Sequence, residues 1–263
     1  MEVAPVLQRL TLVPKGGMCN RLQALASARR LCQLLHARCT VVWVWGDFED
    51  FFVRLPEVSL VPEPREAGAK RIVQRAIRVD PARSVDVSVR SVELHSGYLF
   101  WGSHEPPIPF SAIRPFLPQL NSRLGEQVSE FSARHLQNTV GFHLRRADNR
   151  TSTRCSPDVL FLQRARSLVA AGKRIFLATD NLETERKLKT RFGDAIITRP
   201  KRDPLAQRWP RPEFNPTAAE DDLIDLFLLA RTEYVVGCHG SSFTNTAIAL
   251  NGSARCEKLV VSG

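Results

Sequence analysis

The sequence predicts an α/β protein made of two units, each with a parallel sheet covered by helices. Short β-branched runs alternate with segments of helical periodicity along most of the chain, which indicates parallel strands joined by crossover helices. Ten of the seventeen prolines fall in two windows, 104–118 and 199–216, where loops are expected. A chain of 263 residues is also long enough for two hydrophobic cores.

The first unit is expected to open with a β-α-β segment. The pattern predicts a strand at 10–13, an amphipathic helix at 20–36 and a buried strand at 39–45. The alternation resumes after the first proline window. Its expected strands are 139–144, 174–178, 195–198 and 234–237, and its expected helices are 157–171, 182–192, 220–230 and 242–250. We expect the two units to join near 119–138, with a cleft between them.

Composition and charge narrow the class of protein. A hydrophobic fraction of 43% and a charged fraction of 24% are typical of globular chains and exclude a disordered or fibrous protein. The net charge of +10 favours polyanions, membrane surfaces or phosphate-bearing substrates without choosing among them. No apolar run approaches the roughly 20 residues of a membrane span. The sequence as it stands has no secretory signal, so a cytoplasmic protein is expected, with the Golgi or ER lumen open if a leader or anchor was removed.

Six cysteines are present, without a CxxC motif or the Cys/His spacing of a zinc finger. We therefore expect free thiols in a reducing compartment and no structural zinc.

Ligands in open α/β sheets lie beyond the carboxyl ends of strands, so the loops that follow strands are the first places to look for a site. The first such loop is Pro14-Lys15-Gly16-Gly17-Met18-Cys19-Asn20-Arg21. Its two glycines allow a close backbone approach, and the amides at the helix start can meet an anion. The alternative is a plain βα turn. The loop lacks both the P-loop and the dinucleotide patterns, although Lys15 keeps a phosphosulfate-binding loop open.

The second loop, His143-Leu-Arg-Arg-Ala-Asp148, follows a predicted strand. In extended backbone, His143 and Arg145 point to the same side, so the strand end presents an imidazole and a guanidinium together. A forked guanidinium suits a diphosphate better than an ammonium does. Asp148 is placed to orient one of the two arginines. The alternative is a solvated basic turn.

Two further loops carry polar residues. Thr179, Asp180 and Asn181 either cap the next helix or contact a nucleotide or sugar. Ser241 and Ser242, followed by a helix, are expected to form an anion-binding nest.

The expected helix 220–230 carries Asp225 among apolar residues. A buried carboxylate needs a partner. The two candidates are a local cation such as Arg231 and an amino group on a purine edge.

Together these motifs resemble those of the GT-B fucosyltransferases, the group that contains the core α1,6-, protein O- and nodulation-factor fucosyltransferases. The first signature is similar to His143-Leu-Arg-Arg-Ala-Asp148, and the second to Asp222-Leu-Ile-Asp225 followed by a strand and Gly240-Ser-Ser-Phe243. The N-terminal Gly16-Gly17-Met-Cys-Asn20-Arg21 is similar to the glycine-rich loop of the family's acceptor-side domain.

The resemblance implies a GT-B-like α/β fold, with two Rossmann-like domains facing across a cleft. Residues 1–125 would form the acceptor-side domain and 126–263 the nucleotide-sugar-binding domain. It also implies an inverting, metal-independent glycosyltransferase that moves a sugar, fucose from GDP-fucose first, to a hydroxyl of a glycan or protein. No cofactor, specific nucleic acid or transmembrane segment is expected.

The resemblance also implies roles for single residues. Arg145 would bind the β-phosphate and stabilise the departing diphosphate, with Asp148 as a second catalytic residue. His143 and Asp225 would contact guanine. The remaining expected donor contacts are Ser241, Ser242, Phe243, Asp180, Gly16, Gly17, Asn20 and Arg21.

The general base is not assigned by the resemblance. The core α1,6 members have a glutamate after the arginine motif, and the matching position here is Thr153. Asp148, Asp47 and Glu49 are the candidates, unless the transition state is dissociative enough to need none.

Two other functions remain open at this stage. The loop around Lys15 allows a phosphosulfate-dependent sulfotransferase. The net charge and the arginine-rich segment 199–211 allow a basic nucleic-acid-binding protein, although no nucleic-acid-binding motif is present.

Overall fold

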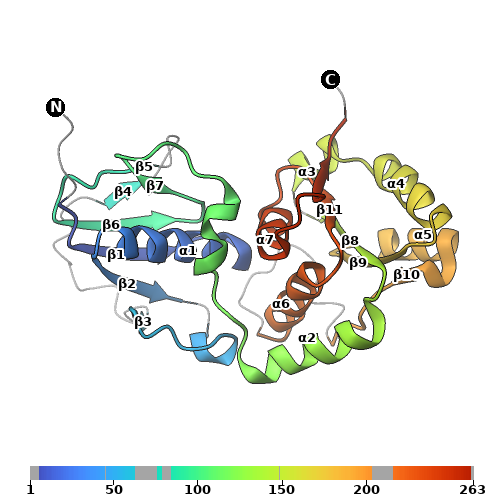
Figure 1. Ribbon diagram of the computed structural model, residues 1–263, viewed down its shortest axis with the longest axis horizontal. Coiled ribbons are helices and arrows are strands. Elements are labelled where there is room, and N and C mark those ends of the chain that lie inside the picture. Colours follow the sequence, from blue (N-terminus) through green and yellow to red (C-terminus); the bar gives the residue numbers. More distant parts are fainter. Residues whose placement is uncertain are drawn as a thin grey trace. The chain divides into compact units, whose positions relative to one another are not determined.

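The computed structural model describes residues 6–44, 46–62, 76–78, 84–147, 149–202 and 216–261. The chain divides into two compact units, Met1–Asn121 and Ser122–Gly263 (Figure 1). The boundary expected at 125/126 falls inside α2 (Ser122–His135), which belongs wholly to the second unit. Each unit contains its own five-stranded parallel sheet, so the predicted α/β class is confirmed.

The sheet of the first unit has the strand order β3-β2-β1-β6-β4. Its elements are β1 (Arg9–Pro14), α1 (Met18–Leu34), β2 (Arg38–Trp43), β3 (Val58–Pro62), β4 (Ala76–Arg78) and β6 (Ser91–Ser96). Helix α1 lies along one face of this sheet (Figure 1). The 3-10 helix η2 (Phe110–Phe116), from the first proline window, contacts α1. The short strands β5 (Ser84–Val85) and β7 (Trp101–Gly102) pair with each other, and η1 (Phe48–Asp50) is a single 3-10 turn.

Helix α1 forms the main packing layer of the first unit. Leu22, Leu25 and Leu31 are 1% exposed or less, and most residues of α1 between Met18 and Cys32 are buried. The helix ends at Leu34 rather than at the expected residue 36, because His36 has a positive φ of 51° that no α-helix contains.

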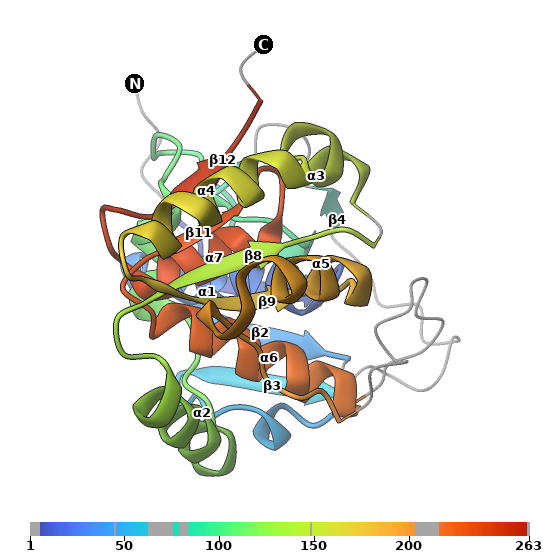
Figure 2. The same cartoon turned by 90° about the vertical axis from the view of Figure 1, so that its right-hand side faces the viewer.

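The sheet of the second unit has the order β10-β9-β8-β11-β12. Its strands are β8 (Thr139–Leu144), β9 (Arg174–Thr179), β10 (Ile196–Ile197), β11 (Val235–Cys238) and β12 (Glu257–Leu259). Its helices after α2 are α3 (Arg150–Cys155), α4 (Asp158–Ala170), α5 (Leu182–Phe192), α6 (Pro216–Ala230) and α7 (Ser242–Asn251), with the 3-10 turn η3 (Gly193–Ala195). Helices α4 and α5 lie on one face of the sheet and α6 and α7 on the other (Figure 1), and the turned view of Figure 2 shows α4 and α5 in front of β8 and β9.

Strand β8 occupies the centre of this sheet, and all six of its residues are buried. Phe142 packs edge-on against Phe161 of α4, with ring centroids 5.7 Å apart. From β8 the chain proceeds to β9 on one side and later to β11 on the other. The order of strands therefore reverses between β8 and β11, which is the topological switch point at which doubly wound sheets bind ligands.

Two further observations concern the whole of the described chain. All six cysteines are free thiols. Among the described residues, no helix combines the length and the apolar composition that crossing a membrane requires.

Candidate functional site

The switch point of the second unit brings together two loops that the sequence singles out separately. His143 lies opposite Gly237 in the register of β8 and β11. Just beyond, the backbone N–H of Arg145 donates to Sγ of Cys238 at 3.4 Å. The loop that begins with Arg145 and the loop that follows Cys238 therefore leave the sheet side by side.

Helix α3 holds the loop after β11 in place. Asn149 Nδ2 donates to the carbonyl of Gly240 and Ser152 Oγ to that of His239, each at 2.9 Å. The N–H of His239 in turn donates to Oγ of Ser156 at 2.9 Å. Gly240 has a φ of +68°, a conformation that favours glycine. These bonds preorganise the backbone that leads into α7.

His143 packs against the first turn of α7. Its side chain is buried, with Nδ1 at 2.7 Å from Oγ1 of Thr244. Its ring stacks on Phe243, with centroids 4.5 Å apart and an interplanar angle of 17°. The expected nucleotide-contacting residues His143 and Phe243 are thus in direct contact.

The electrostatic surroundings keep His143 neutral. Burial lowers the pKa of His143, the charges of Arg145, Arg146 and Lys201 act in the same direction, and together they bring it to about 3. At neutral pH the ring can therefore donate or accept a hydrogen bond, but it carries no charge.

Arg146 is a structural residue. Its buried side chain donates from Nε to Oδ1 of Asp158 at 2.6 Å and from a terminal nitrogen to the carbonyl of Ser156 at 2.9 Å. Its guanidinium also lies over the ring of Phe161, 5.5 Å from the centroid. These contacts fix the loop to α4, and they leave Arg146 little freedom to bind a ligand.

Arg145 is the more accessible of the two arginines. Its side chain is 28% exposed and pairs with Oδ2 of Asp180 at 3.1 Å. The expected catalytic partner Asp148 lies outside the described residues. Arg145 is therefore the cation that the loop after β8 presents, and Asp180 orients it.

Asp180 shapes the loop after β8. Besides Arg145, its carboxylate accepts from the backbone N–H of Arg146 at 2.7 Å and of Ala147 at 3.2 Å. The cap of α5 is instead Asn181, whose side chain accepts from the N–H of Thr184. These contacts make Asp180 a residue that positions Arg145.

The first turn of α7 is the place where the sequence predicts an anion-binding nest. Ser241 is 2% exposed, and its Oγ caps the helix by accepting from the N–H of Thr244 at 3.3 Å. Ser242 and Phe243 follow as the first helical residues. The unpaired N–H groups and the dipole of a helix N-terminus attract an anion.

Asp225 has partners that the sequence did not indicate. Its side chain is buried and lies on α6. Of the two partners that the sequence left open, the local cation Arg231 is wrong, because two other cations pair with Asp225. Arg199 Nε donates to Oδ1 of Asp225 at 3.2 Å, and the ammonium of Lys201 contacts Oδ2. Both cations come from the beginning of the second proline window, which carries no signal of such a contact.

The glycine-rich loop of the first unit is braced by its own side chains. Gly16 has a φ of +80°, and Gly17 precedes the first residue of α1. Asn20 Nδ2 donates to the carbonyl of Gly97 at 2.8 Å, which ties this loop to the one after β6. Arg21 is buried, and its guanidinium donates to two carbonyls of the loop at 2.7 and 2.9 Å. Asn20 and Arg21 therefore hold the backbone in shape.

The other candidate bases have local roles. Asp47 caps the 3-10 helix η1 by accepting from the N–H of Glu49 at 3.2 Å. Glu49 lies 3.8 Å from Nε of Arg54 in an exposed pair. Thr153 Oγ1 donates to the carbonyl of Asn149 at 3.2 Å within α3.

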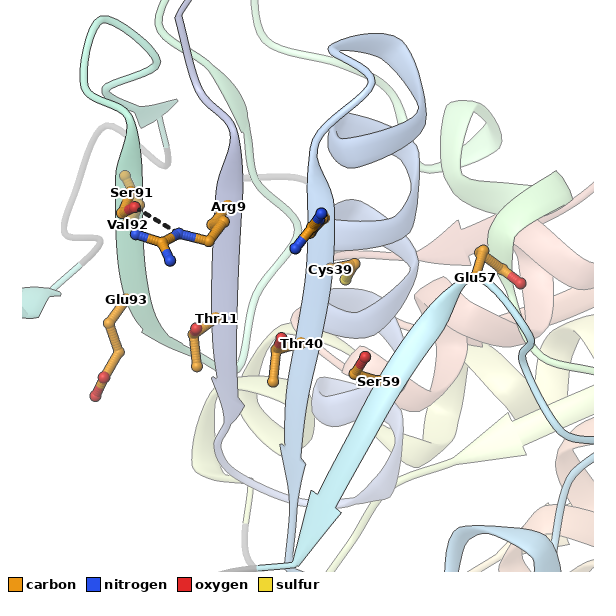
Figure 3. A pocket seen from close by; sticks show the side chains of 10 residues that line it. Arg9, Thr11, Cys39, Thr40, Glu57, Ser59, Ser91, Val92 and Glu93 are labelled. Atoms are coloured by element: carbon orange, nitrogen blue, oxygen red, sulfur yellow. Dashed lines mark hydrogen bonds between the residues drawn. The ribbon is translucent and has the colours of Figure 1, made fainter.

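A shallow polar pocket of about 580 Å³ lies on the sheet of the first unit. Most of its side chains, such as those of Thr11, Thr40 and Ser59, project from the strands away from α1 (Figure 3), whereas Glu57 pairs with Arg29 of α1. The residues that line the pocket are Arg9, Thr11, Arg38, Cys39, Thr40, Glu57, Ser59, Ser91, Val92 and Glu93. The chain between β3 and β4 lies outside the described residues, so we assign this face no ligand. Within the described part of the chain, no group of three or more His, Cys, Asp or Glu residues is arranged to hold a metal ion.

Comparison with known proteins identifies the fold. The sequence matches no protein-family profile and no curated protein. Solved structures do match over most of the chain. NodZ α-1,6-fucosyltransferase, in crystals soaked with GDP-fucose, superposes with a TM-score of 0.62 and 18% identity, covering 93% of this chain and 92% of that one.

Two other fucosyltransferases share the fold. A variant of Arabidopsis thaliana FUT1 in complex with GDP matches with a TM-score of 0.58 and 13% identity, over 94% of this chain and 69% of that one. POFUT1 without ligand matches with a TM-score of 0.54 and 13% identity, over 98% and 99%. The chain therefore has the fucosyltransferase-like GT-B fold, and the predicted fold class is confirmed.

Proposed function

We propose that this protein is an inverting, metal-independent glycosyltransferase that moves a sugar from a nucleotide donor, GDP-fucose first, to a hydroxyl of a glycan or protein. One observation carries the proposal. His143 and Arg145 lie with the N-terminus of α7 at the switch point of the second sheet. This is where a doubly wound sheet binds a nucleotide, in a fold shared with an enzyme whose crystals were soaked with GDP-fucose.

The arrangement suits the departure of a diphosphate. Negative charge accumulates on the diphosphate as the glycosidic bond breaks, so a preorganised cation stabilises the transition state more than the ground state. Arg145 supplies a forked guanidinium held by Asp180. The first turn of α7, capped by Ser241 and continued by Ser242, offers N–H groups to the same phosphates. We assign Arg145 as the catalytic residue.

His143, Asp225 and Phe243 form the nucleoside part of the proposed site. The neutral ring of His143 is stacked on Phe243, and this apolar pair suits the base or the ribose. Asp225 offers carboxylate oxygens to the donor groups of a purine. Gly16, Gly17, Asn20 and Arg21 are also proposed as donor contacts, with Asn20 and Arg21 holding the backbone of their loop.

The acceptor needs a base only if its oxygen attacks before the glycosidic bond is largely broken. Asp148, Asp47 and Glu49 are the carboxylates proposed for that role. Inversion follows from direct attack by the acceptor on the face opposite the diphosphate.

The test is a calorimetric titration of the purified protein with GDP, UDP and 3′-phosphoadenosine 5′-phosphate in the presence of EDTA. Micromolar binding of GDP alone supports a guanine-diphosphate site that needs no metal. A preference for UDP would support a glycosyltransferase but contradict GDP-fucose as its donor. Binding of 3′-phosphoadenosine 5′-phosphate alone would favour a sulfotransferase. Binding of none of the three nucleotides would contradict the proposal.

A further inference from the structure

A lysine next to α6 has hydrogen-bond donors that the described residues do not use. The ammonium of Lys201 contacts Oδ2 of Asp225, and the two side chains are only 11% and 5% exposed. An ammonium carries three N–H donors. Among the described residues, Asp225 is its one hydrogen-bond acceptor. A nearly buried cation with two remaining donors is suited to a ligand that brings acceptors.

The neighbouring Arg199 uses four of its five N–H donors within the described residues. It donates to Oδ1 of Asp221 and to the carbonyl of Asp221, each at 2.9 Å, and to the carbonyl of Pro200 at 3.1 Å. Its Nε also donates to Asp225. Arg199 is therefore a clamp that fixes the segment after β10 to α6, and it places Lys201 beside Asp225.

This pair belongs to the same region as the switch point. The charge of Lys201 lowers the pKa of His143 together with those of Arg145 and Arg146. Lys201 is thus one of the charged groups that act on the imidazole. Helix α6, which carries Asp225, also packs against β8, the strand that ends in His143.

The pair offers a donor next to an acceptor, and guanine offers the complementary edge. Guanine presents the acceptor O6 beside the donors N1–H and the 2-amino group, whereas adenine presents an amino group in place of O6. We propose that Lys201 donates to O6 of guanine while Asp225 accepts from N1–H and the 2-amino group. Lys201 is thus a residue that determines the base specificity of the donor site. This inference rests on the proposed function.

A competing interpretation makes the opposite prediction. If Lys201 only neutralises Asp225, its ammonium occupies the carboxylate that a purine needs. Removing the ammonium would then free Asp225 and strengthen the binding of GDP.

The experiment compares wild type, Lys201→Met and Lys187→Met by calorimetry with GDP, ADP and 6-thioguanosine diphosphate. Lys187 is a matched control, because it is 58% exposed on α5 and pairs with Glu183. The thio analogue keeps both donors of guanine and replaces O6 by sulfur, a weak acceptor. Lys201→Met is expected to weaken the binding of GDP about tenfold or more, because a hydrogen bond from a charged group is lost. Lys187→Met is expected to behave like wild type.

The thio analogue tests the same contact without a mutation. Wild type is expected to bind it severalfold more weakly than GDP, and Lys201→Met is expected to abolish that difference. The wild-type comparison can overturn the inference even if Lys201→Met fails to fold, because equal affinity would mean that O6 accepts no important hydrogen bond. Equal affinity of wild type for GDP and its thio analogue, or unchanged or tighter GDP binding by Lys201→Met, would overturn the inference. Failure of the wild type to bind GDP at all would instead overturn the proposed function.

Discussion

Arg145 and Asp180 form an ion pair of 3.1 Å between the ends of two neighbouring strands, β8 and β9. The same carboxylate accepts the N–H groups of Arg146 and Ala147. One side chain therefore fixes both the backbone of the loop and the direction of its cation. The adjacent Arg146 faces the other way, into the contact with α4. The two adjacent arginines therefore have different roles: Arg145 is presented by the loop, and Arg146 holds the loop to α4.

Replacing the two arginines by alanine should affect stability very differently. Arg146→Ala removes partly buried bonds to Asp158 and to the carbonyl of Ser156, so the free energy of unfolding should fall by about 2–3 kcal/mol. Arg145→Ala removes a partly exposed ion pair, and the fall should stay below about 1 kcal/mol. Denaturant unfolding of both variants checks this. Equal losses would contradict the assignment of Arg146 as the structural residue.

Asp180→Asn should reduce donor affinity through Arg145. Asparagine keeps one acceptor for the loop amides but loses the charge that orients the guanidinium. We expect the kcat/KM for the sugar donor to fall about tenfold, with a loss of stability of about 1–2 kcal/mol. The double variant Asp180→Asn with Arg145→Ala should be no less active than Arg145→Ala alone. A further independent loss would show that Asp180 contacts the donor itself.

Arg199→Ala should be strongly destabilising. It removes the shared partner of two buried carboxylates, Asp221 and Asp225, and breaking such a buried pair costs about 3–5 kcal/mol. Arg134→Ala is the control, because its pair with Glu130 is exposed at both ends. That variant should unfold at nearly the wild-type denaturant concentration. A small effect of Arg199→Ala on the free energy of unfolding would show that the ion pairs of Arg199 contribute little to stability.

Acid should destabilise the second unit through His143. The pKa of His143 is about 3 in the folded protein, whereas an unfolded histidine titrates near its ordinary value of 6.5. As the pH falls below 6.5 the unfolded chain takes up a proton that the folded chain does not, so stability decreases until the pH approaches 3. This single group contributes up to about 1.4 kcal/mol per pH unit.

Urea unfolding at a series of pH values between about 5 and 6.5 measures how the free energy of unfolding depends on pH. His143→Gln removes the titration and should flatten the dependence, whatever its effect at neutral pH. His135→Gln, at an exposed position of α2, should leave the slope unchanged. A wild-type slope in His143→Gln would disprove the prediction.

Much of the second unit could be predicted from the sequence because its elements are locally marked. The bounds of β8 and α5 agree with the expectation, since β8 is buried on both faces and Asn181 caps α5. Strand β6 alternates buried Val92 and Leu94 with polar Glu93, which is typical of a strand, but it was missed because the prediction relied on continuous apolar runs. Helix α2 was taken as a connection because only Leu124 and Val128 are buried along it.

The candidate site could be predicted only in part, for a physical reason. Residues that follow strands share a sheet edge, so the proximity of His143 to the start of α7 follows from the pattern. The partners of Asp225 do not, because Arg199 and Lys201 reach it from a proline-containing segment 26 and 24 residues away. Long-range ion pairs leave no periodic signal in a sequence.

The most direct test of the account is the release of GDP from GDP-fucose, measured in EDTA for wild type, Arg145→Ala and Arg145→Lys. We expect turnover by the wild type and a loss of about 100- to 1,000-fold in Arg145→Ala with its unfolding transition retained, as when one preorganised donor is removed from a transition state. Arg145→Lys should recover little, because it lacks the fork. Turnover by Arg145→Ala at the wild-type rate would contradict the central claim.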